Sequence, residues 1–360
     1  MSQVLFFDYL KGNDHIEGIN RLLVQSGFID AIPDEGSVAI KLHMGELGNI
    51  RYLRPFFVSS VVRLVKEKGG KPFLFDTVAS YPGSRDTKRK YLSTAATNGF
   101  SKGSIGAPIV IADDSDKQVV VKIDDPVDGC QLDEVKIPAV LLDADCIIAL
   151  SHVKGHELAG FGGAVKNLAM GCVSTETKRL QHDVARPQFN QEACDLCGQC
   201  VDECPTGAIA VFDGLSRDEV KCISCGTCLS CCSSQGWVWP AGSKELLQVY
   251  MAHATAAFLG AYKGNIGYMN FVQDIVPYCD CMEVSGQPIV PDIGVLFSDD
   301  AVSVDKASLD LIDLSPIIPH TVSFGPPDVL GQMHNTNSLV QLNTAEKLKV
   351  GGVHYKMDSI

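Results

Sequence analysis

The stretch CIIALSHVKGHELAGFGGAVKNLAMGC (146–172) decides the fold class of this chain. Its beginning, 146–153, is an apolar run that predicts a buried strand. Glycines follow at 155, 160, 162 and 163, and the residues after Gly163 predict a helix. A strand that turns through glycines into a helix is the repeating unit of α/β proteins. Glycines at such a turn also let the backbone approach a ligand closely, and a helix that begins there would offer N–H groups to an anion.

The same alternation continues on both sides of this stretch. Toward the N-terminus we expect strands at 4–10, 37–44 and 72–76, helices at 15–30, 53–68 and 86–98, and short β-branched runs at 108–112 and 119–123. Toward the C-terminus we expect a helix at 243–262, strands at 267–272 and 292–298, and a helix at 301–313 capped by Asp300. This order predicts an α/β fold, a mainly parallel sheet with helices on both faces. The tail after residue 320 has too little pattern to assign.

Residues 187–241 interrupt the alternation, because spaced cysteines replace the apolar periodicity there. We therefore expect a small α+β insert, resembling a ferredoxin with two clusters, within a larger domain. The larger α/β domain would be discontinuous, formed by residues 1–186 and 242–360.

A repeated cysteine motif lies inside this insert. CDLCGQCVDEC (194–204) and CISCGTCLSCC (222–232) align residue for residue, which indicates a duplicated unit. Both have the C-x2-C-x2-C-x3-C spacing that binds 4Fe–4S clusters, in which the fourth cysteine ligates the other cluster. One cluster is therefore assigned to Cys194, Cys197, Cys200 and Cys232, and the other to Cys222, Cys225, Cys228 and Cys204. Two zinc sites are the alternative, although each would need only two C-x2-C pairs.

In the second motif, the assignment of the fourth ligand has an alternative. Cys231 stands beside Cys232 and could substitute for it, although the spacing favours Cys232. A buried thiol without a metal is the simpler interpretation of Cys231.

Polar residues gather where buried strands of the α/β part end. His152, Lys154, His156, Lys166 and Asn167 follow the strand at 146–150, and KLHMGELGN (41–49) brings Lys41, His43 and Glu46. Ligands of open α/β sheets bind beyond the carboxyl ends of the strands. We therefore interpret His152, Lys154, His156 and Lys166 as candidate catalytic residues, although a glycine-rich turn that only packs helix on sheet would explain the pattern too.

A third metal site is also compatible with the sequence. Cys279 and Cys281 are two residues apart and would face the same side of an extended backbone. Histidines and thiols together suit a transition metal, so the candidate set is His43, His152, His156, His182, Cys279 and Cys281. An anionic ligand in place of the metal, or two reduced thiols in a core, are the alternatives.

The charge and the cysteine content indicate which partners and which cellular compartment to expect. The formal net charge is −13 at pH 7, which disfavours nucleic acid and anionic membranes and favours a redox partner with a basic docking face. The start of the chain carries Asp8 and no basic lead, so it does not resemble a secretory signal. Fourteen cysteines in a chain that can build its own core indicate metal ligands rather than disulfides. We expect a reduced, cytoplasmic protein.

Several of these stretches resemble the family called domain of unknown function 362, in particular its members with a ferredoxin insert. They are KLHMGELGN, YPGSRDT, ADCIIALSHVKGHELAGFGGAVKNLAMGC, the Gln-His pair at 181–182, Cys279 to Cys281, and PDIGVLFSDDAVSVDKASLDL. The resemblance runs from about residue 37 to 315 and implies an anaerobic iron–sulfur protein without an agreed reaction. It supports the site at His152, Lys154, His156, Lys166 and Cys279 to Cys281. The chain departs from the family at Ala301 and Ser233, where proline is expected.

Three functions fit these features. The first is electron transfer through two 4Fe–4S clusters, to a partner protein or to a site in the α/β part. The second is a reductive enzyme in which the clusters supply a site that binds a small-molecule substrate with a metal or an anion. The third is a factor for metallocofactor maturation or metal delivery, with Cys279 and Cys281 holding a labile ion.

Overall fold

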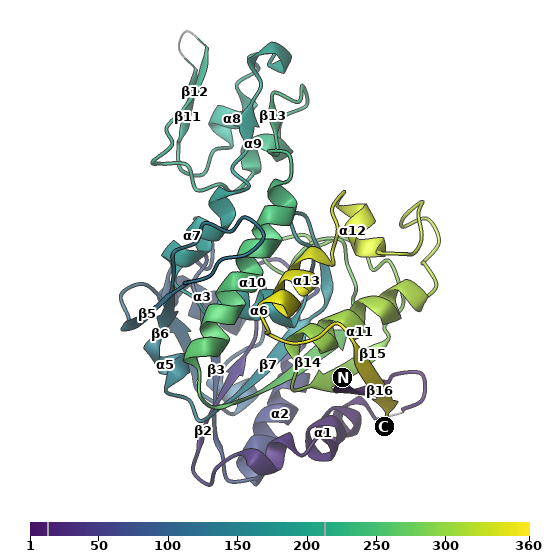
Figure 1. The fold of residues 1–360 in the computed structure, drawn as a ribbon. Coiled ribbons are helices and arrows are strands. Elements are labelled where there is room, and N and C mark those ends of the chain that lie inside the picture. The colour runs from purple at the N-terminus through teal and green to yellow at the C-terminus, as the bar shows by residue number, and fades with distance from the viewer. Residues whose placement is uncertain (13, 212–213) are drawn as a thin grey trace.

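The computed structural model describes residues 1–12, 14–211 and 214–360. Its centre is an eight-stranded mixed sheet (Figure 1). The strands lie in the order β16 (Tyr355–Ser359), β1 (Ser2–Asp8), β15 (Gly294–Ser298), β14 (Asn265–Val272), β7 (Cys146–His152), β2 (Ser37–Lys41), β3 (Lys71–Thr77) and β4 (Ile109–Ala112).

The strands that carry the candidate site run in one direction. β14, β7, β2, β3 and β4 pair in parallel, whereas β15 is antiparallel to both β14 and β1. Lys41 lies beside Ala149 of β7 and Phe75 of β3 in the sheet register. The carboxyl ends of these strands therefore meet at one edge of the sheet, and the predicted mainly parallel sheet is confirmed.

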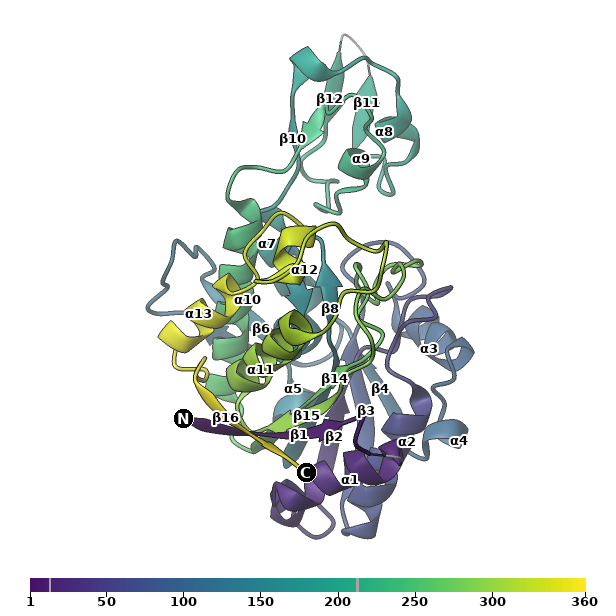
Figure 2. The same ribbon diagram turned by 90° about the vertical axis from the view of Figure 1, so that its right-hand side faces the viewer.

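Helices cover both faces of the sheet, and each face has its own hydrophobic core. Figures 1 and 2 show these two layers. One face packs against α1 (His15–Gln25), α2 (Pro55–Glu67), α3 (Lys88–Thr97) and α4 (Lys102–Ile105). The other packs against α5 (Ala139–Leu142), α6 (Ala164–Gly171), α10 (Ser243–Ala261), α11 (Ala301–Leu314), α12 (Val329–Met333) and α13 (Val340–Lys347).

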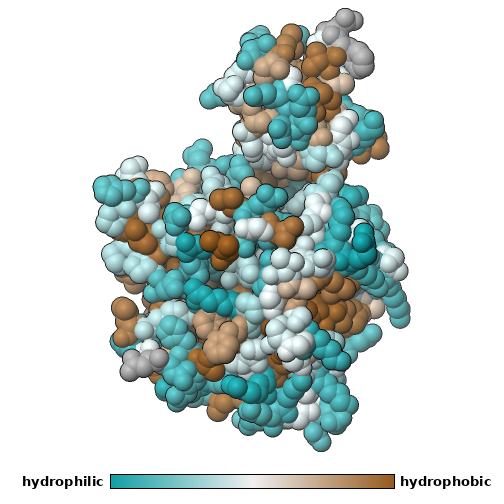
Figure 3. Space-filling view, turned by 180° about the vertical axis from the view of Figure 1, so that it is seen from behind, coloured by the Kyte–Doolittle hydropathy of each residue, from teal (hydrophilic) through white to brown (hydrophobic). Residues whose placement is uncertain are grey.

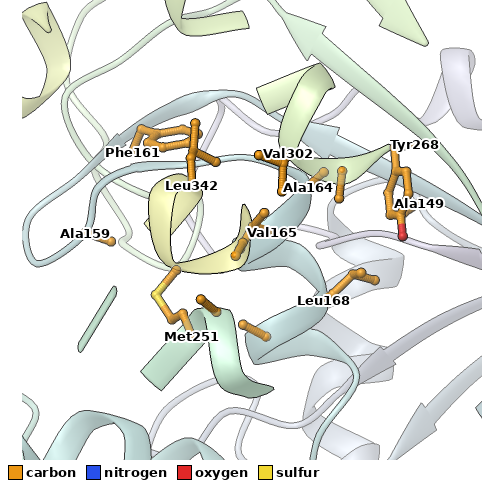
Figure 4. Packing of buried hydrophobic residues seen from close by; sticks show 14 of the residues in the cluster. Ala149, Ala159, Phe161, Ala164, Val165, Leu168, Met251, Tyr268, Val302 and Leu342 are labelled. Atoms are coloured by element: carbon orange, nitrogen blue, oxygen red, sulfur yellow. The ribbon is translucent and has the colours of Figure 1, made fainter. Parts of the chain in front are cut away.

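Helix α6 is the centre of the second layer. Val165 and Leu168 of α6 are fully buried, and α6 contacts both α10 and α11. Figure 4 shows α6 residues close to Met251 of α10, Val302 of α11 and Leu342 of α13. Burial on all sides fixes this helix, and with it the polar residues that α6 presents to the sheet edge.

Several boundaries differ from those the sequence predicts. The helix expected at 15–30 ends at Gln25, because Gly27 has a φ of 73° and a 3-10 turn, η1 (Phe28–Ala31), follows. The strand expected at 37–44 ends at Lys41. Asp300 does cap α11, since its side chain accepts hydrogen bonds from the backbone N–H groups of Val302 and Ser303. The unassigned tail supplies α12, α13 and β16.

Two small hairpins lie outside the main sheet. The β-branched run at 119–123 forms β5 (Gln118–Lys122), which pairs with β6 (Glu134–Pro138). The glycine-rich stretch forms β8 (Lys154–His156) and β9 (Gly160–Gly162), an antiparallel pair that links β7 to α6.

The cysteine-rich segment stands out from the body of the protein (Figures 1 and 2). It follows α7 (Thr175–Asp183) and contains β10 (Gln188–Phe189), η2 (Gln191–Ala193), α8 (Gln199–Asp202), β11 (Ile209–Val211), β12 (Leu215–Arg217), α9 (Thr227–Ser230) and β13 (Trp237–Val238). Its own small core contains Cys200, Ile209, Cys228 and Trp237.

The face of the molecule that is turned away from the viewer in Figure 1 carries mostly hydrophilic residues, with separate hydrophobic spots among them (Figure 3). Among the residues that the structure describes, no helix combines the length and the apolar character needed to cross a membrane.

Candidate functional site

A cavity lies at the sheet edge where β14, β7, β2 and β3 end. It encloses about 850 Å³ of space, counted out to its open mouth. The structure brings all the candidates from distant segments into its lining: Lys41, His43, His152, Lys154, His156, Lys166, Asn167, His182, Cys279 and Cys281. The predicted position of a pocket beyond the strand ends is confirmed. The chemical roles of these residues remain predictions.

His152 anchors the loop that carries the two cysteines. Its Nδ1 hydrogen bonds with Asp280 Oδ1 at 2.8 Å, and its Nε2 with the carbonyl oxygen of Gln273 at 2.8 Å. Both ring nitrogens therefore face protein acceptors, and neither is directed at Cys279 or Cys281. This corrects the expectation that His152 belongs with the metal-ligating histidines, because the ring is used to hold Asp280 in place.

Asp280 is a buried anion between the two cysteines. Its Oδ2 lies 3.2 Å from the ammonium nitrogen of Lys154, which also donates a hydrogen bond to the carbonyl oxygen of His152. Burial alone would raise the pKa of Asp280, but the charges of His152 and Lys154 hold it well below its usual range. Asp280 is thus ionised and bound to His152 and Lys154, which fixes the orientation of the loop.

The two thiols meet at the wall of the cavity. Ligand atoms of His156, Cys279 and Cys281 all lie within 4.8 Å of one another, and Lys166 Nζ donates to Cys279 Sγ at 3.6 Å. The hydrogen bond from Cys281 lowers the pKa of Cys279 well below its usual value, and Lys166 contributes despite burial. The same hydrogen bond raises the pKa of Cys281. Cys279 is therefore the more acidic thiol of the pair.

The backbone at this pair differs from the expectation. Cys279 and Cys281 lie in a turn, in which the N–H of Met282 donates to the carbonyl oxygen of Cys279 at 3.0 Å, rather than on an extended strand. The two side chains nevertheless reach the same cavity.

His156 and His182 present different nitrogens. His156 Nδ1 accepts from the backbone N–H groups of Leu158 and Ala159, each at 3.2 Å. Burial lowers the pKa of His156 well below its usual value, so the neutral ring carries its proton on Nε2. His182 Nδ1 instead bonds with the carbonyl oxygen of Lys178 at 2.7 Å, which leaves its Nε2 as an acceptor.

His43 has a buried polar atom without a partner. Its Nδ1 accepts from the N–H of Gly45 at 3.0 Å. Burial, together with the charge of Arg85, lowers the pKa of His43 well below its usual value, so the proton lies on Nε2. No side chain or backbone atom in the described residues pairs with this Nε2. An unpaired buried donor that lines a cavity indicates a missing acceptor, such as a ligand atom.

Sequence reasoning named Lys41, Glu46 and Asn167 but missed their charged partners Asp76 and Arg85 in the same cavity. Lys41 Nζ lies 3.1 Å from Asp76 Oδ1 and donates to Asn167 Oδ1 at 2.7 Å. Arg85 Nε donates to Glu46 Oε2 at 2.9 Å and lines the cavity wall. Asp76 lies at the carboxyl end of β3 and Arg85 in the loop after it, so the strand-end argument used for β2 and β7 would have found them.

Lys178 is a lining cation whose pKa is lowered by burial. It extends from α7 into the cavity and donates to the carbonyl oxygen of Val78. Burial lowers its pKa to about 7, while the nearby carboxylate of Asp76 opposes the change. No sequence pattern marked Lys178, because only the folded structure shows that this residue of α7 lines the cavity. In all, five cationic side chains line a space that has two carboxylates, Asp76 and Asp280.

The start of α6 is not free for an anion, which corrects another expectation. Asp305 of α11 accepts hydrogen bonds from the N–H groups of Ala164 at 2.6 Å and Val165 at 2.9 Å. A Cβ on Gly163 would come within 2.2 Å of the same carboxylate. Glycine at 163 therefore makes room for Asp305, which occupies the positive end of the helix. Anion binding in the cavity depends instead on side chains.

The cysteine-rich segment contains two small cavities that sort the eight cysteines crosswise. One is lined by Cys204 together with Cys222, Cys225 and Cys228. The other is lined by Cys232 together with Cys194, Cys197 and Cys200, and by Trp237. Cys231 lines neither of them.

The two halves of this segment share one local geometry. Gly198 and Gly226 have φ values of 81° and 78°, and Leu196 and Ser224 both have a φ of 57°. Left-handed residues tighten the turn and bring neighbouring thiols to one side. The N–H groups of Ala208 and Gly236 donate to the sulfurs of Cys204 and Cys232, each at 3.2 Å. Donors aimed at sulfur suit thiolate ligands, so these residues fit cluster binding.

Hydrogen bonds join this segment to the cavity wall. Ser224, between Cys222 and Cys225, donates to Asp183 Oδ1 at 2.7 Å, and Arg186 donates to Ser224 Oγ at 3.2 Å. Asp183 ends α7 directly after His182, which lines the cavity. The Cys222 half of the segment is therefore joined by hydrogen bonds to the end of α7, next to the cavity-lining His182.

These features define an α/β protein with a polar cavity at the carboxyl edge of its sheet and a cysteine-rich insert. The chain belongs to the family described as domain of unknown function (DUF362), which matches residues 38–310. No protein with a curated description matches the chain.

Two solved structures are similar to this chain at low identity. One is a crystal structure of a protein from Thermotoga maritima, a target of the Northeast Structural Genomics Consortium, with 12% identity and a TM-score of 0.47. It covers 82% of this chain and 58% of its own. The other is the lactate racemase apoprotein from Thermoanaerobacterium thermosaccharolyticum, with 12% identity, a TM-score of 0.36, and coverage of 76% and 51%. The chain thus spans little more than half of either.

Proposed function

We propose that this chain is an iron–sulfur protein that transfers electrons through two 4Fe–4S clusters to the cavity of its α/β part. The observation that carries the proposal is the crosswise sorting of the cysteines, Cys204 with the second triple and Cys232 with the first. This exchange of the fourth ligand is the arrangement of two-cluster ferredoxins. A pair of zinc sites, each formed by two C-x2-C pairs, would not explain why the fourth cysteine of each motif lies with the other triple.

The residues of the cysteine-rich segment would hold the two clusters close together and would limit the access of water to them. Each cluster supplies one-electron transfer when it is bound. Backbone donors to Cys204 and Cys232 stabilise thiolate charge, and the buried ring of Trp237 limits water at the first cluster. The separate small core of this segment supports its treatment as a domain, residues 187–241, inserted into a discontinuous domain of residues 1–186 and 242–360.

The electron donor would be a redox partner protein. The net charge of −13 favours a basic docking face on that partner, and the protruding segment is accessible to it (Figure 1).

The cavity favours the second function, a reductive site for an anionic small molecule, over a carrier alone. Lys41, Arg85, Lys154 and Lys166, set against the carboxylates Asp76 and Asp280, leave an excess of positive charge that attracts an anion into an otherwise acidic protein, and Lys178 adds to this excess below pH 7. Metal delivery through Cys279 and Cys281 is the third function. It would be recognised by stoichiometric transfer of a metal other than cluster iron to an acceptor.

Matched serine variants of the adjacent cysteines test the cluster assignment. Cys232→Ser should lose about half of the cluster iron, because one cluster loses a ligand. Cys231→Ser should keep the full iron content and an unchanged electron paramagnetic resonance spectrum after dithionite reduction. If Cys231→Ser loses the iron and Cys232→Ser keeps it, the assignment is wrong.

A further inference from the structure

The geometry of Cys279 and Cys281 is that of a reactive pair. Their sulfurs lie within 4.8 Å of each other at the cavity wall. Asp280 between them is held by His152 and Lys154, so the intervening residue cannot rotate into the thiols' place. The turn closed by Met282 shortens the separation of the two Cα atoms. Two cysteines in a turn of this kind come within the range that a disulfide spans, roughly 4.4–6.8 Å between Cα atoms.

The surroundings of the pair suit a thiolate better than a bound cation. The ammonium group of Lys166 lies 3.6 Å from Cys279 Sγ, and Lys154 lines the same cavity. These charges stabilise a thiolate and repel a divalent ion at the same position. His156 also places its acceptor nitrogen against two backbone N–H groups, which leaves a proton rather than a lone pair on Nε2. His156 is therefore an unfavourable third ligand for a metal at this pair.

We propose that Cys279 and Cys281 form a redox-active dithiol that reduces a small anionic disulfide by thiol–disulfide exchange. This inference rests on the proposed function, because the two clusters would return the electrons. A disulfide takes up two electrons, and two clusters that carry one electron each supply that number. Ser224, between Cys222 and Cys225, donates to Asp183, the residue after the cavity-lining His182, so we expect a cluster held by the second triple to be the direct donor.

The cavity also explains why the substrate would be an anion. The N–H of His43 Nε2 is buried and unpaired in the described residues and lines the same space as the thiols. Lys166, which donates to Cys279 Sγ, lines the same cavity. A carboxylate or phosphate on the substrate would accept from these donors and place its disulfide near Cys279.

The chemistry balances in three steps. The Cys279 thiolate attacks one substrate sulfur, which forms a mixed disulfide and releases one substrate thiolate. Cys281 gives its proton to the thiolate released in the first step and attacks Cys279 Sγ, which forms the Cys279–Cys281 disulfide and releases the second substrate thiolate. Two electrons from the clusters and one proton then restore a thiolate on Cys279 and a thiol on Cys281.

Trapping the mixed disulfide tests this scheme, with oxidised glutathione as the anionic probe. Under anaerobic conditions the wild-type chain should yield a Cys279–Cys281 disulfide in the peptide that contains residues 279–281, detected by mass spectrometry. Cys281→Ser should instead accumulate one glutathione on Cys279, because the resolving thiol is absent. Cys279→Ser should give neither product, and Cys231→Ser should behave as wild type.

The outcomes separate this inference from the proposed function. Cluster iron and the paramagnetic spectrum should be unchanged in Cys279→Ser and Cys281→Ser, since both residues lie outside the cysteine-rich segment. Loss of the clusters in every preparation would remove the proposed function but leave the trapping result intact. The dithiol is overturned if Cys281→Ser traps no glutathione. It is also overturned if the wild-type pair holds a stoichiometric metal ion that both variants lose.

Discussion

Lys178 is the residue whose charge should couple folding to pH. Burial lowers its pKa to about 7 from 10.5, so between these values the unfolded chain binds a proton that the folded chain does not. The free energy of unfolding should therefore rise with pH in this window, by at most about 1.4 kcal/mol per pH unit. Below pH 7 both states are protonated and the slope disappears.

Urea unfolding at pH 7 and pH 9 measures this contribution. Lys178→Met keeps the buried volume and removes the titrating group, so the rise from pH 7 to pH 9 should be smaller in the variant. Equal slopes in both proteins would mean that Lys178 stays protonated in the folded chain.

Individual site residues could be predicted where they directly follow a strand. His43, His152 and His156 were found because parallel strands end at one edge of the sheet. The partners of these residues could not be found. The bond from His152 to Asp280 joins segments far apart in the sequence, and only the fold shows that it uses a ring nitrogen that a metal would need.

Helix α6 depends on a carboxylate from another element. Asp305→Ala should leave the N–H groups of Ala164 and Val165 without their acceptor, and also the side chain of Asn270. Loss of such a cap should lower the free energy of unfolding by about 2 kcal/mol. Asp299→Ala is the matched control, because Asp299 is exposed and its removal should change stability by less than about 0.5 kcal/mol. Equal effects in thermal unfolding would show that Asp305 does not support α6.

At the level of elements, a strong hydrophobic periodicity was sufficient to predict a helix or a strand, whereas a weak pattern was not. The apolar faces of α1, α2 and α11 and the buried runs of β3 and β7 gave the right element types. Strand β16 was missed because an edge strand pairs only with β1 and needs little apolar content. The anion site expected at the start of α6 was wrong, since the sequence does not show that Asp305 reaches it.

For the whole molecule, the sequence distinguished the cysteine-rich insert from the α/β part, but it did not show how the two pack together. The cysteine repeat marked the insert, because ligand spacing is a local property. The bond from Ser224 to Asp183, which brings one half of the insert to the cavity, depends on how the two parts pack. Only the three-dimensional arrangement could show which half faces the cavity.

Iron and acid-labile sulfide in anaerobically purified protein test the central claim most directly. Two 4Fe–4S clusters predict about eight irons and about eight sulfides per chain, together with bleaching of visible absorption on reduction. Two zinc ions and no sulfide would contradict the account, because the electron-transfer function and the supply of electrons to the cavity both depend on these clusters.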